Sequence, residues 1–105
     1  MTYQQIIKLQ ENWGITDTQN GINSGDIWKF EGSIGRMIMQ LLEDGVVMLP
    51  KEPTYDYYGT QLPARQWLKD GTKGTFQNSV NFWQRVIDGD FEAIEYLESI
   101  TETEG

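Results

Sequence analysis

Apolar residues recur at helical spacing in four separate segments of this chain of 105 residues. The most regular pattern follows Thr75 or Ser79, either of which can cap the N-terminus of a helix. Apolar side chains then recur at Phe76, Val80, Phe82, Trp83, Val86 and Ile87. Because this spacing gathers side chains on one face of an α-helix, we expect a deeply buried helix here.

Two further helices are bounded by residues that commonly begin and end helices. Thr2 and Gln5 have the spacing of a capping box, and Gly14 follows the helix that this box predicts. Near the C-terminus, Asp90 is expected to cap a helix with its apolar side chains inward, at Phe91, Ile94 and Leu97. We expect residues 101–105 to form a frayed tail, because they carry no apolar anchor.

The remaining apolar stripe predicts a helix that starts after Ser24 and ends at Gly45, following a polar loop over residues 16–25. Gly32 and Gly35 lie inside this helix and each costs about 1 kcal/mol relative to alanine. The helix therefore either breaks at these glycines or packs closely against something there, and we expect it to be continuous. The side chains expected to face inward are Ile27, Phe30, Ile34, Met37, Ile38, Leu41 and Leu42.

Glu31 lies within that apolar stripe on a helical projection, and Gly35 leaves a notch beside it one turn later. A carboxylate that faces a core needs a partner or a proton. One interpretation is an acid that recognises a ligand or a partner in a small pocket. The interpretation we favour is structural: either the helix breaks and exposes Glu31, or Glu31 forms a buried pair with Arg36, Arg65 or Lys69.

The central part of the chain, residues 50–74, is rich in proline and glycine. Because an unstructured loop of that length is unusual in a compact domain, we expect short strands within it. Residues 46–49 are expected to pair near residues 61–62, with a turn at Tyr58-Gly59 and one helical turn over residues 64–69. The sequence thus predicts a single, mainly α domain of about four helices, whose long central loop has room for a short two-stranded β element.

The chain contains neither cysteine nor histidine. Thiol nucleophiles, thiolate zinc sites, imidazole bases and histidine-ligated metals are therefore excluded. Paired carboxylates remain formally possible catalysts, but a glycosidase needs an extended cleft, and no calcium-loop spacing is present. We expect no enzymatic activity, no cofactor and no metal. Without a signal-peptide pattern or an apolar run of roughly 18 residues, we expect a cytoplasmic protein that does not enter membranes.

The net charge of −8 is concentrated near the C-terminus, where residues 86–105 hold seven acids and no base. Because no basic face is visible, direct binding to nucleic acid is not expected. Glu92, Glu95 and Glu98 lie three residues apart and form one ridge on the outer face of the last helix. Such a ridge could dock on a basic partner, but we favour a solvated surface that keeps the protein soluble.

Two loops carry candidate binding residues. Residues 71–75 resemble a phosphate-binding loop, in which backbone amides at a helix N-terminus and Lys73 hold an anion. The glycine spacing departs from that of a P-loop, so we favour a turn followed by a helix cap. In the other loop, tyrosines offer a large contact area at low entropic cost, although the same rings could cover the core. That loop is formed by Tyr55, Asp56, Tyr57 and Tyr58.

These observations favour a non-enzymatic protein that binds another protein through the tyrosine-rich loop and the neighbouring helix surface. By analogy with small acidic helical proteins of phages and mobile elements, we expect it to inhibit a host or defence factor. The alternative is a small-ligand or nucleotide-binding protein that holds a small anionic ligand in a pocket. That pocket would be formed by Glu31, Arg36, Arg65, Lys73 and Thr75. A homo-oligomer is compatible with either function.

Overall fold

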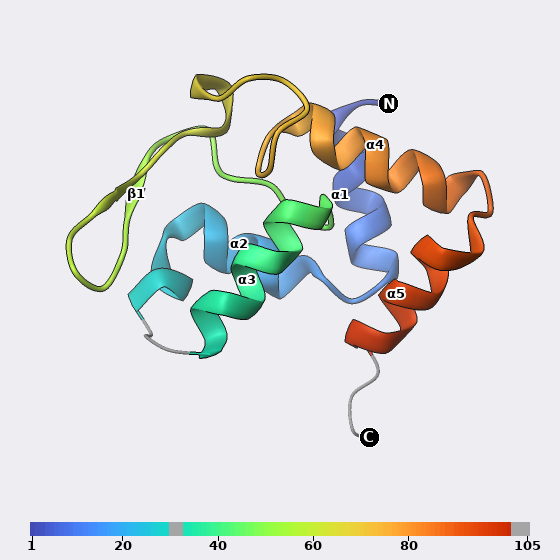
Figure 1. The fold of residues 1–105 in the computed structure, drawn as a ribbon, viewed down its shortest axis with the longest axis horizontal. Coiled ribbons are helices and arrows are strands. Elements are labelled where there is room, and N and C mark those ends of the chain that lie inside the picture. Colours follow the sequence, from blue (N-terminus) through green and yellow to red (C-terminus); the bar gives the residue numbers. More distant parts are fainter. Residues whose placement is uncertain (30–32, 102–105) are drawn as a thin grey trace.

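Five α-helices and two short 3₁₀-helices make up most of the chain that the structure describes (Figure 1). The structure is a computed structural model, and it describes residues 1–29 and 33–101. The predicted mainly α fold, with a small two-stranded β element in the central region, is confirmed. In chain order the elements are α1 (Tyr3–Asn12), α2 (Thr16–Ser24), η1 (Asp26–Lys29), α3 (Ser33–Asp44), β1 (Thr54–Tyr55), β2 (Gln61–Leu62), η2 (Arg65–Trp67), α4 (Phe76–Ile87) and α5 (Phe91–Thr101).

Helix α4 lies at the centre of the helical packing, because it contacts α1, α3 and α5. Helix α1 also packs on α2, which in turn contacts η1. The hairpin formed by β1 and β2 projects from the side of the molecule opposite α5 (Figure 1). The molecule is flat, with extents of 40 × 34 × 19 Å.

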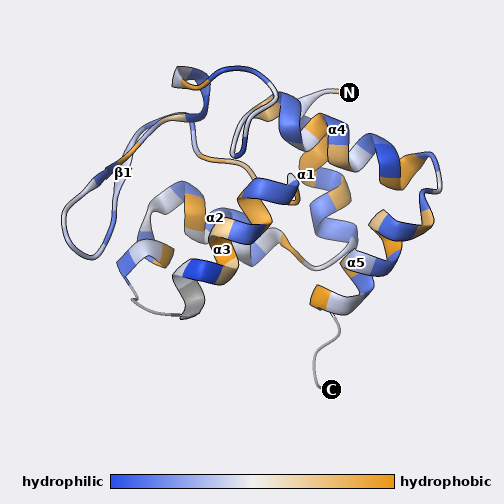
Figure 2. Ribbon diagram, in the orientation of Figure 1, coloured by the Kyte–Doolittle hydropathy of each residue, from blue (hydrophilic) through white to orange (hydrophobic). Residues whose placement is uncertain are grey.

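An extended segment, residues 45–50, runs through the middle of the core, and every one of its residues is buried. Figure 2 shows it as the largely orange trace that leads from the end of α3 towards the hairpin. No strand of the described chain pairs with this segment. Its backbone N–H and C=O groups therefore need other partners, since a buried backbone group without one is costly.

Side chains of three helices supply partners for Gly45, Val46 and Met48, while Gly74 and Arg65 bond to Leu49 and Pro50. Gln10 of α1 and Trp83 of α4 both donate to the carbonyl oxygen of Val46, at 3.0 and 3.2 Å. Ser79 of α4 donates to the carbonyl oxygen of Gly45 at 2.6 Å. The side-chain amide of Gln19 in α2 donates to the carbonyl oxygen of Met48 and accepts from the N–H of Met48. The Gln19 side-chain oxygen also accepts from Gln10 Nε2. For Gly45, Val46 and Met48, helix side chains thus take the place of a neighbouring strand.

The predicted strand over residues 46–49 is therefore wrong. The strands that form are Thr54–Tyr55 and Gln61–Leu62, with Thr54 opposite Leu62 in an antiparallel pair. The predicted turn at Tyr58-Gly59 is confirmed, because Gly59 has a φ of +83° and donates its N–H to Asp56 O at 3.0 Å. The predicted helical turn over residues 64–69 appears as η2.

Two predictions for residues 16–44 are also wrong. The polar loop over residues 16–25 is in fact helix α2, which buries Gln19 and Ile22 and ends at Gly25. The α-helix predicted to run from Ser24 to Gly45 begins only at Ser33, because residues 26–29 form the 3₁₀-helix η1. Glu31 and Gly32 lie outside the described residues.

Gly45 ends α3 as predicted, and its position permits no side chain. Its φ is +95°, and a Cβ atom there would lie 2.6 Å from the carbonyl oxygen of Asn78. Gly35 differs, because a Cβ atom at that position meets no other heavy atom within 4 Å. Within the described chain, no other residue therefore packs into the notch expected at Gly35. Met37, expected to face inward, is 56% exposed.

The helix caps predicted at Thr2, Thr75 and Asp90 are confirmed, whereas Ser24, predicted to cap the helix that ends at Gly45, is the last residue of α2. Thr2 and Gln5 form both bonds of the capping box, and Thr75 Oγ1 accepts from Asn78 N at 3.2 Å. Asp90 Oδ1 accepts from Ala93 N, and the Arg85 side chain together with this bond holds the pKa of Asp90 below its usual value.

The apolar faces of α4 and α5 are narrower than predicted. Ile87 and Phe91, expected inside, are 54% and 72% exposed on either side of the turn between the two helices. Helix α5 buries Leu97, as predicted, together with Ala93. Thr101, expected in the frayed tail, is the last residue of α5, and residues 102–105 lie outside the described part of the chain.

Gln19→Met tests the role of the buried amide. The variant keeps a side chain of similar length but leaves the N–H and C=O of Met48 without partners in the core. We expect it to lower the free energy of unfolding by about 2–4 kcal/mol, as measured by urea denaturation. The control is Gln77→Met on the exposed face of α4, which should change this free energy by less than about 0.5 kcal/mol.

Gly35→Ala should raise the free energy of unfolding by up to about 1 kcal/mol, because alanine favours the helix and the new Cβ meets open space. Gly74→Ala is the contrasting variant. Gly74 has a φ of +85°, and a Cβ there would lie 2.6 Å from Leu49 Cδ1, so we expect a clear loss of stability. Thermal melts measure whether the melting temperature rises with Gly35→Ala and falls with Gly74→Ala. A lower melting temperature for Gly35→Ala would mean that another group packs against Gly35.

Candidate binding surface

The hairpin is an arm that is closed at its base. The backbone N–H of Arg65 donates to the carbonyl oxygen of Pro50 at 2.9 Å, and Gln66 Nε2 donates to Lys51 O at 2.7 Å. At the tip, Asp56 Oδ1 accepts from the N–H groups of Tyr58 and Thr60, at 2.9 and 2.8 Å. Asp56, predicted as a partner-binding residue, therefore orders the turn that carries the tyrosines.

The three tyrosines of the arm are exposed. The exposed fractions of Tyr55, Tyr57 and Tyr58 are 55%, 57% and 73%. The rings of Tyr57 and Tyr58 meet edge to face, with their centroids 5.0 Å apart. Tyr55 Oη accepts from Gln61 Nε2 at 3.3 Å across the hairpin. None of these rings covers the core. The alternative interpretation, in which the tyrosines shield the core from solvent, is therefore wrong.

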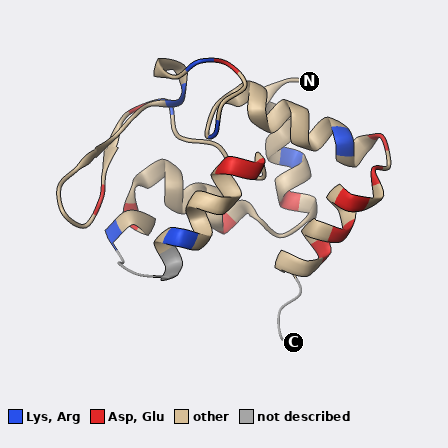
Figure 3. Cartoon of the chain, viewed as in Figure 1, with Lys and Arg blue, Asp and Glu red and all other residues tan. Residues whose placement is uncertain are grey.

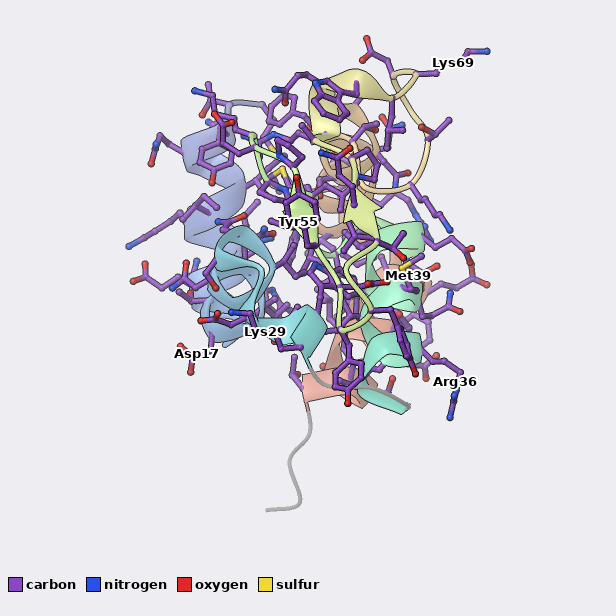
Figure 4. The ribbon with its side chains drawn as sticks, turned by 90° about the vertical axis from the view of Figure 1, so that its left-hand side faces the viewer. Asp17, Lys29, Arg36, Met39, Tyr55 and Lys69 are labelled. Carbon is purple, nitrogen blue, oxygen red and sulfur yellow. The ribbon has the colours of Figure 1, made fainter. Side chains whose placement is uncertain are left out.

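A groove of about 790 Å³ separates the arm from α3. Tyr57, Tyr58 and Leu62 line it from the arm, Met39 lines it from α3, and Trp28 of η1 also contributes. In Figure 4, which faces the arm, Tyr55 lies at the front, Met39 lies beside the arm, and Arg36 projects outward along α3. Arg36, Gln40, Glu43 and Asp56 supply the polar part of the lining. The groove thus has apolar walls interrupted by polar groups of both charges.

Some residues of this surface were missed from the sequence. Met39 is 37% exposed and lines the groove together with Trp28 of η1. Met39 occupies the same helix face as Arg36, Gln40 and Glu43. A large apolar residue among polar neighbours on a predicted helix is the pattern that could have identified it.

The residues predicted for an anionic ligand do not meet in one place. Arg36 lies at the groove. Arg65 donates to Leu49 O at 2.9 Å and stacks 5.0 Å from the ring of Tyr3, in a separate hollow. Lys73 lines a third pocket, and Glu31 lies outside the described residues. Thr75 is only 2% exposed, and its hydroxyl donates to Thr72 O.

The glycine-rich loop over residues 71–75 has few amides left for an anion. The N–H of Gly71 donates to Thr75 Oγ1, and the N–H of Thr72 donates to Lys69 O. The N–H groups of Gly74 and Thr75 donate to Leu42 O and Thr72 O. The loop is therefore a turn followed by a helix cap, as favoured from the sequence.

Charge is distributed unevenly over the molecule (Figure 3). Glu92, Glu95 and Glu98 are exposed on α5, on the side away from the arm, which agrees with the predicted ridge. Tyr96, on the same helix, hydrogen bonds to Asp44 at the end of α3. Burial and this carboxylate raise the pKa of Tyr96 above its usual value, so its hydroxyl stays protonated and joins α3 to α5.

Within the described ranges, no group of three or more acids is arranged to hold a metal ion, and no helix is long and apolar enough to cross a membrane. No family model, no curated protein and no solved structure matches the chain.

Proposed function

We propose that this protein is a non-enzymatic interaction module that binds another protein through the arm, residues 54–62, and the adjoining surface of α3. The observation that carries this proposal is the gathering of exposed Tyr57, Tyr58 and Met39 around one groove. Tyrosine is enriched at binding hot spots because it offers a large, amphipathic surface with few rotatable bonds.

The arm is also prepared for binding before a partner arrives. Its turn is held by two hydrogen bonds to Asp56 Oδ1, and its base is closed by the bond between Arg65 and Pro50. An ordered loop loses less conformational entropy on binding than a mobile one. The flexible Met39 side chain adds a surface that adjusts to its partner.

The groove suits a protein better than a nucleotide. Arg36, Glu43 and Asp56 place both charges around apolar walls, which is the usual arrangement of an apolar interface centre with a polar rim. A nucleotide site would need several cations at one place, whereas Arg36, Arg65 and Lys73 lie at three different pockets.

Without catalysis, such a module acts by occupying a surface of its partner, as an inhibitor of a host or defence factor would. The proposed setting is cytoplasmic, because a chain without cysteine does not depend on an oxidising compartment for its stability.

Tyr57→Ala and Tyr58→Ala should each leave the melting temperature nearly unchanged, because both rings are exposed. At least one of them should weaken partner binding by about 2 kcal/mol, which is roughly thirtyfold in Kd. Affinity capture with quantitative mass spectrometry identifies proteins retained by the wild type, and titration then gives each Kd.

The matched control is Phe91→Ala, which removes an aromatic ring as exposed as that of Tyr58 from the start of α5, the helix on the opposite side of the molecule. It should retain the same proteins as the wild type. The opposite result would contradict the proposal. If Phe91→Ala loses a protein that both tyrosine variants still retain, the binding surface lies at α5.

A further inference from the structure

A second, smaller pocket of about 310 Å³ adjoins the groove. Seven of its nine lining residues are apolar, and Thr72 and Lys73 are the others. Trp28, Met39 and Leu62 form the boundary with the groove, while Leu42, Leu49 and Leu68 line the pocket alone. A volume of this size is at the lower end of the range for small-molecule sites.

Among the described residues, Lys73 is the one charged residue in the lining, and the fold holds its backbone in place. The N–H of Gly74 donates to Leu42 O at 3.1 Å, and the N–H of Leu49 donates to Gly74 O at 2.9 Å. These bonds fasten the loop that carries Lys73 to the segment that forms the pocket wall. Because Lys73 lines the pocket and is also exposed, it stands at the opening.

The charge of Lys73 is available to a ligand. Within residues 1–29 and 33–101, ion pairs engage Lys8, Lys29 and Arg85, but none engages Lys73. The pocket therefore combines an apolar interior with a single cation at its mouth. Its chemical complement is an apolar chain that ends in one negative charge.

We propose that this pocket binds a small amphiphilic carboxylate of the medium-chain fatty acid class. The hydrocarbon chain lies among the leucines, and the carboxylate pairs with the ammonium group of Lys73. This site goes beyond the protein-binding function proposed for the neighbouring groove and does not depend on it.

The lining favours a free acid over a segment of a protein. A peptide that inserts a side chain brings backbone N–H and C=O groups on both sides, and each would need a partner. Besides Lys73, the described lining offers Thr72, whose Oγ1 already donates to Lys69 O at 2.6 Å, and the indole N–H of Trp28, which is buried. A fatty acid brings one polar group, which matches the one cation.

The test is a titration of the full chain with octanoate, octanol and octylamine, followed by NMR of the Met and Leu methyl groups and the Trp28 indole N–H. Octanoate should bind most tightly and octylamine least, with shifts concentrated at Met39, Leu49, Leu62 and Leu68. Hexanoate should bind roughly fifteenfold more weakly than octanoate, because each buried methylene contributes about fourfold.

Lys73→Met removes the ammonium group and keeps the length of the side chain. It should reduce the affinity for octanoate to that for octanol and leave octanol binding unchanged. Lys69→Met, a neighbouring exposed lysine outside the pocket lining, is the matched control and should bind octanoate as the wild type does. Circular dichroism of each variant verifies that the helices are intact.

Three results would overturn the proposal: equal binding of all three eight-carbon probes, methyl shifts confined to other parts of the molecule, or full octanoate affinity in Lys73→Met. Tighter binding of a capped Leu-Glu dipeptide than of octanoate would also overturn it, in favour of a protein segment. Because Tyr57 and Tyr58 do not line this pocket, failure here leaves the tyrosine experiment unaffected.

Discussion

The fold depends on one buried length of chain, residues 45–50, whose backbone has no neighbouring strand in the described structure. Each unmade hydrogen bond in such a place costs about 1–3 kcal/mol, which is a large part of the stability of a small domain. Gln10, Gln19, Ser79 and Trp83 remove that cost from three different helices. Helices α1, α2 and α4 are thereby positioned by hydrogen bonds to the segment over residues 45–50, in addition to their contacts with one another.

Periodicity and helix caps predicted much of this fold. The stripe from Phe76 and the caps at Thr2, Thr75 and Asp90 are local signals, so they can be recognised in a short window. The central segment could not be assigned in this way. A buried strand and a buried extended chain share the same apolar pattern, and what distinguishes them here is side chains up to 37 positions away.

Helix α2 was missed for a related reason. Its sequence is polar, and what it buries includes Gln19, an amide whose partners lie on other parts of the chain. A search for hydrophobic stripes does not detect a helix whose buried face includes a hydrogen-bonding side chain. The tyrosines were found because they are consecutive, whereas the groove and the pocket combine Trp28, Met39 and Leu62 from three separate elements.

The bond from Arg65 to Pro50 makes the arm a separable unit of the architecture. Ala64 is fully buried and Leu62 packs against the core, so the residues least tied to the central segment are 55–61, and substitutions there need not disturb it. Surface loops of this kind accept insertions and exchanges of sequence at little thermodynamic cost. Natural variation could therefore alter what the arm recognises while the helical body stays the same, and a designer could exchange the arm for another hairpin.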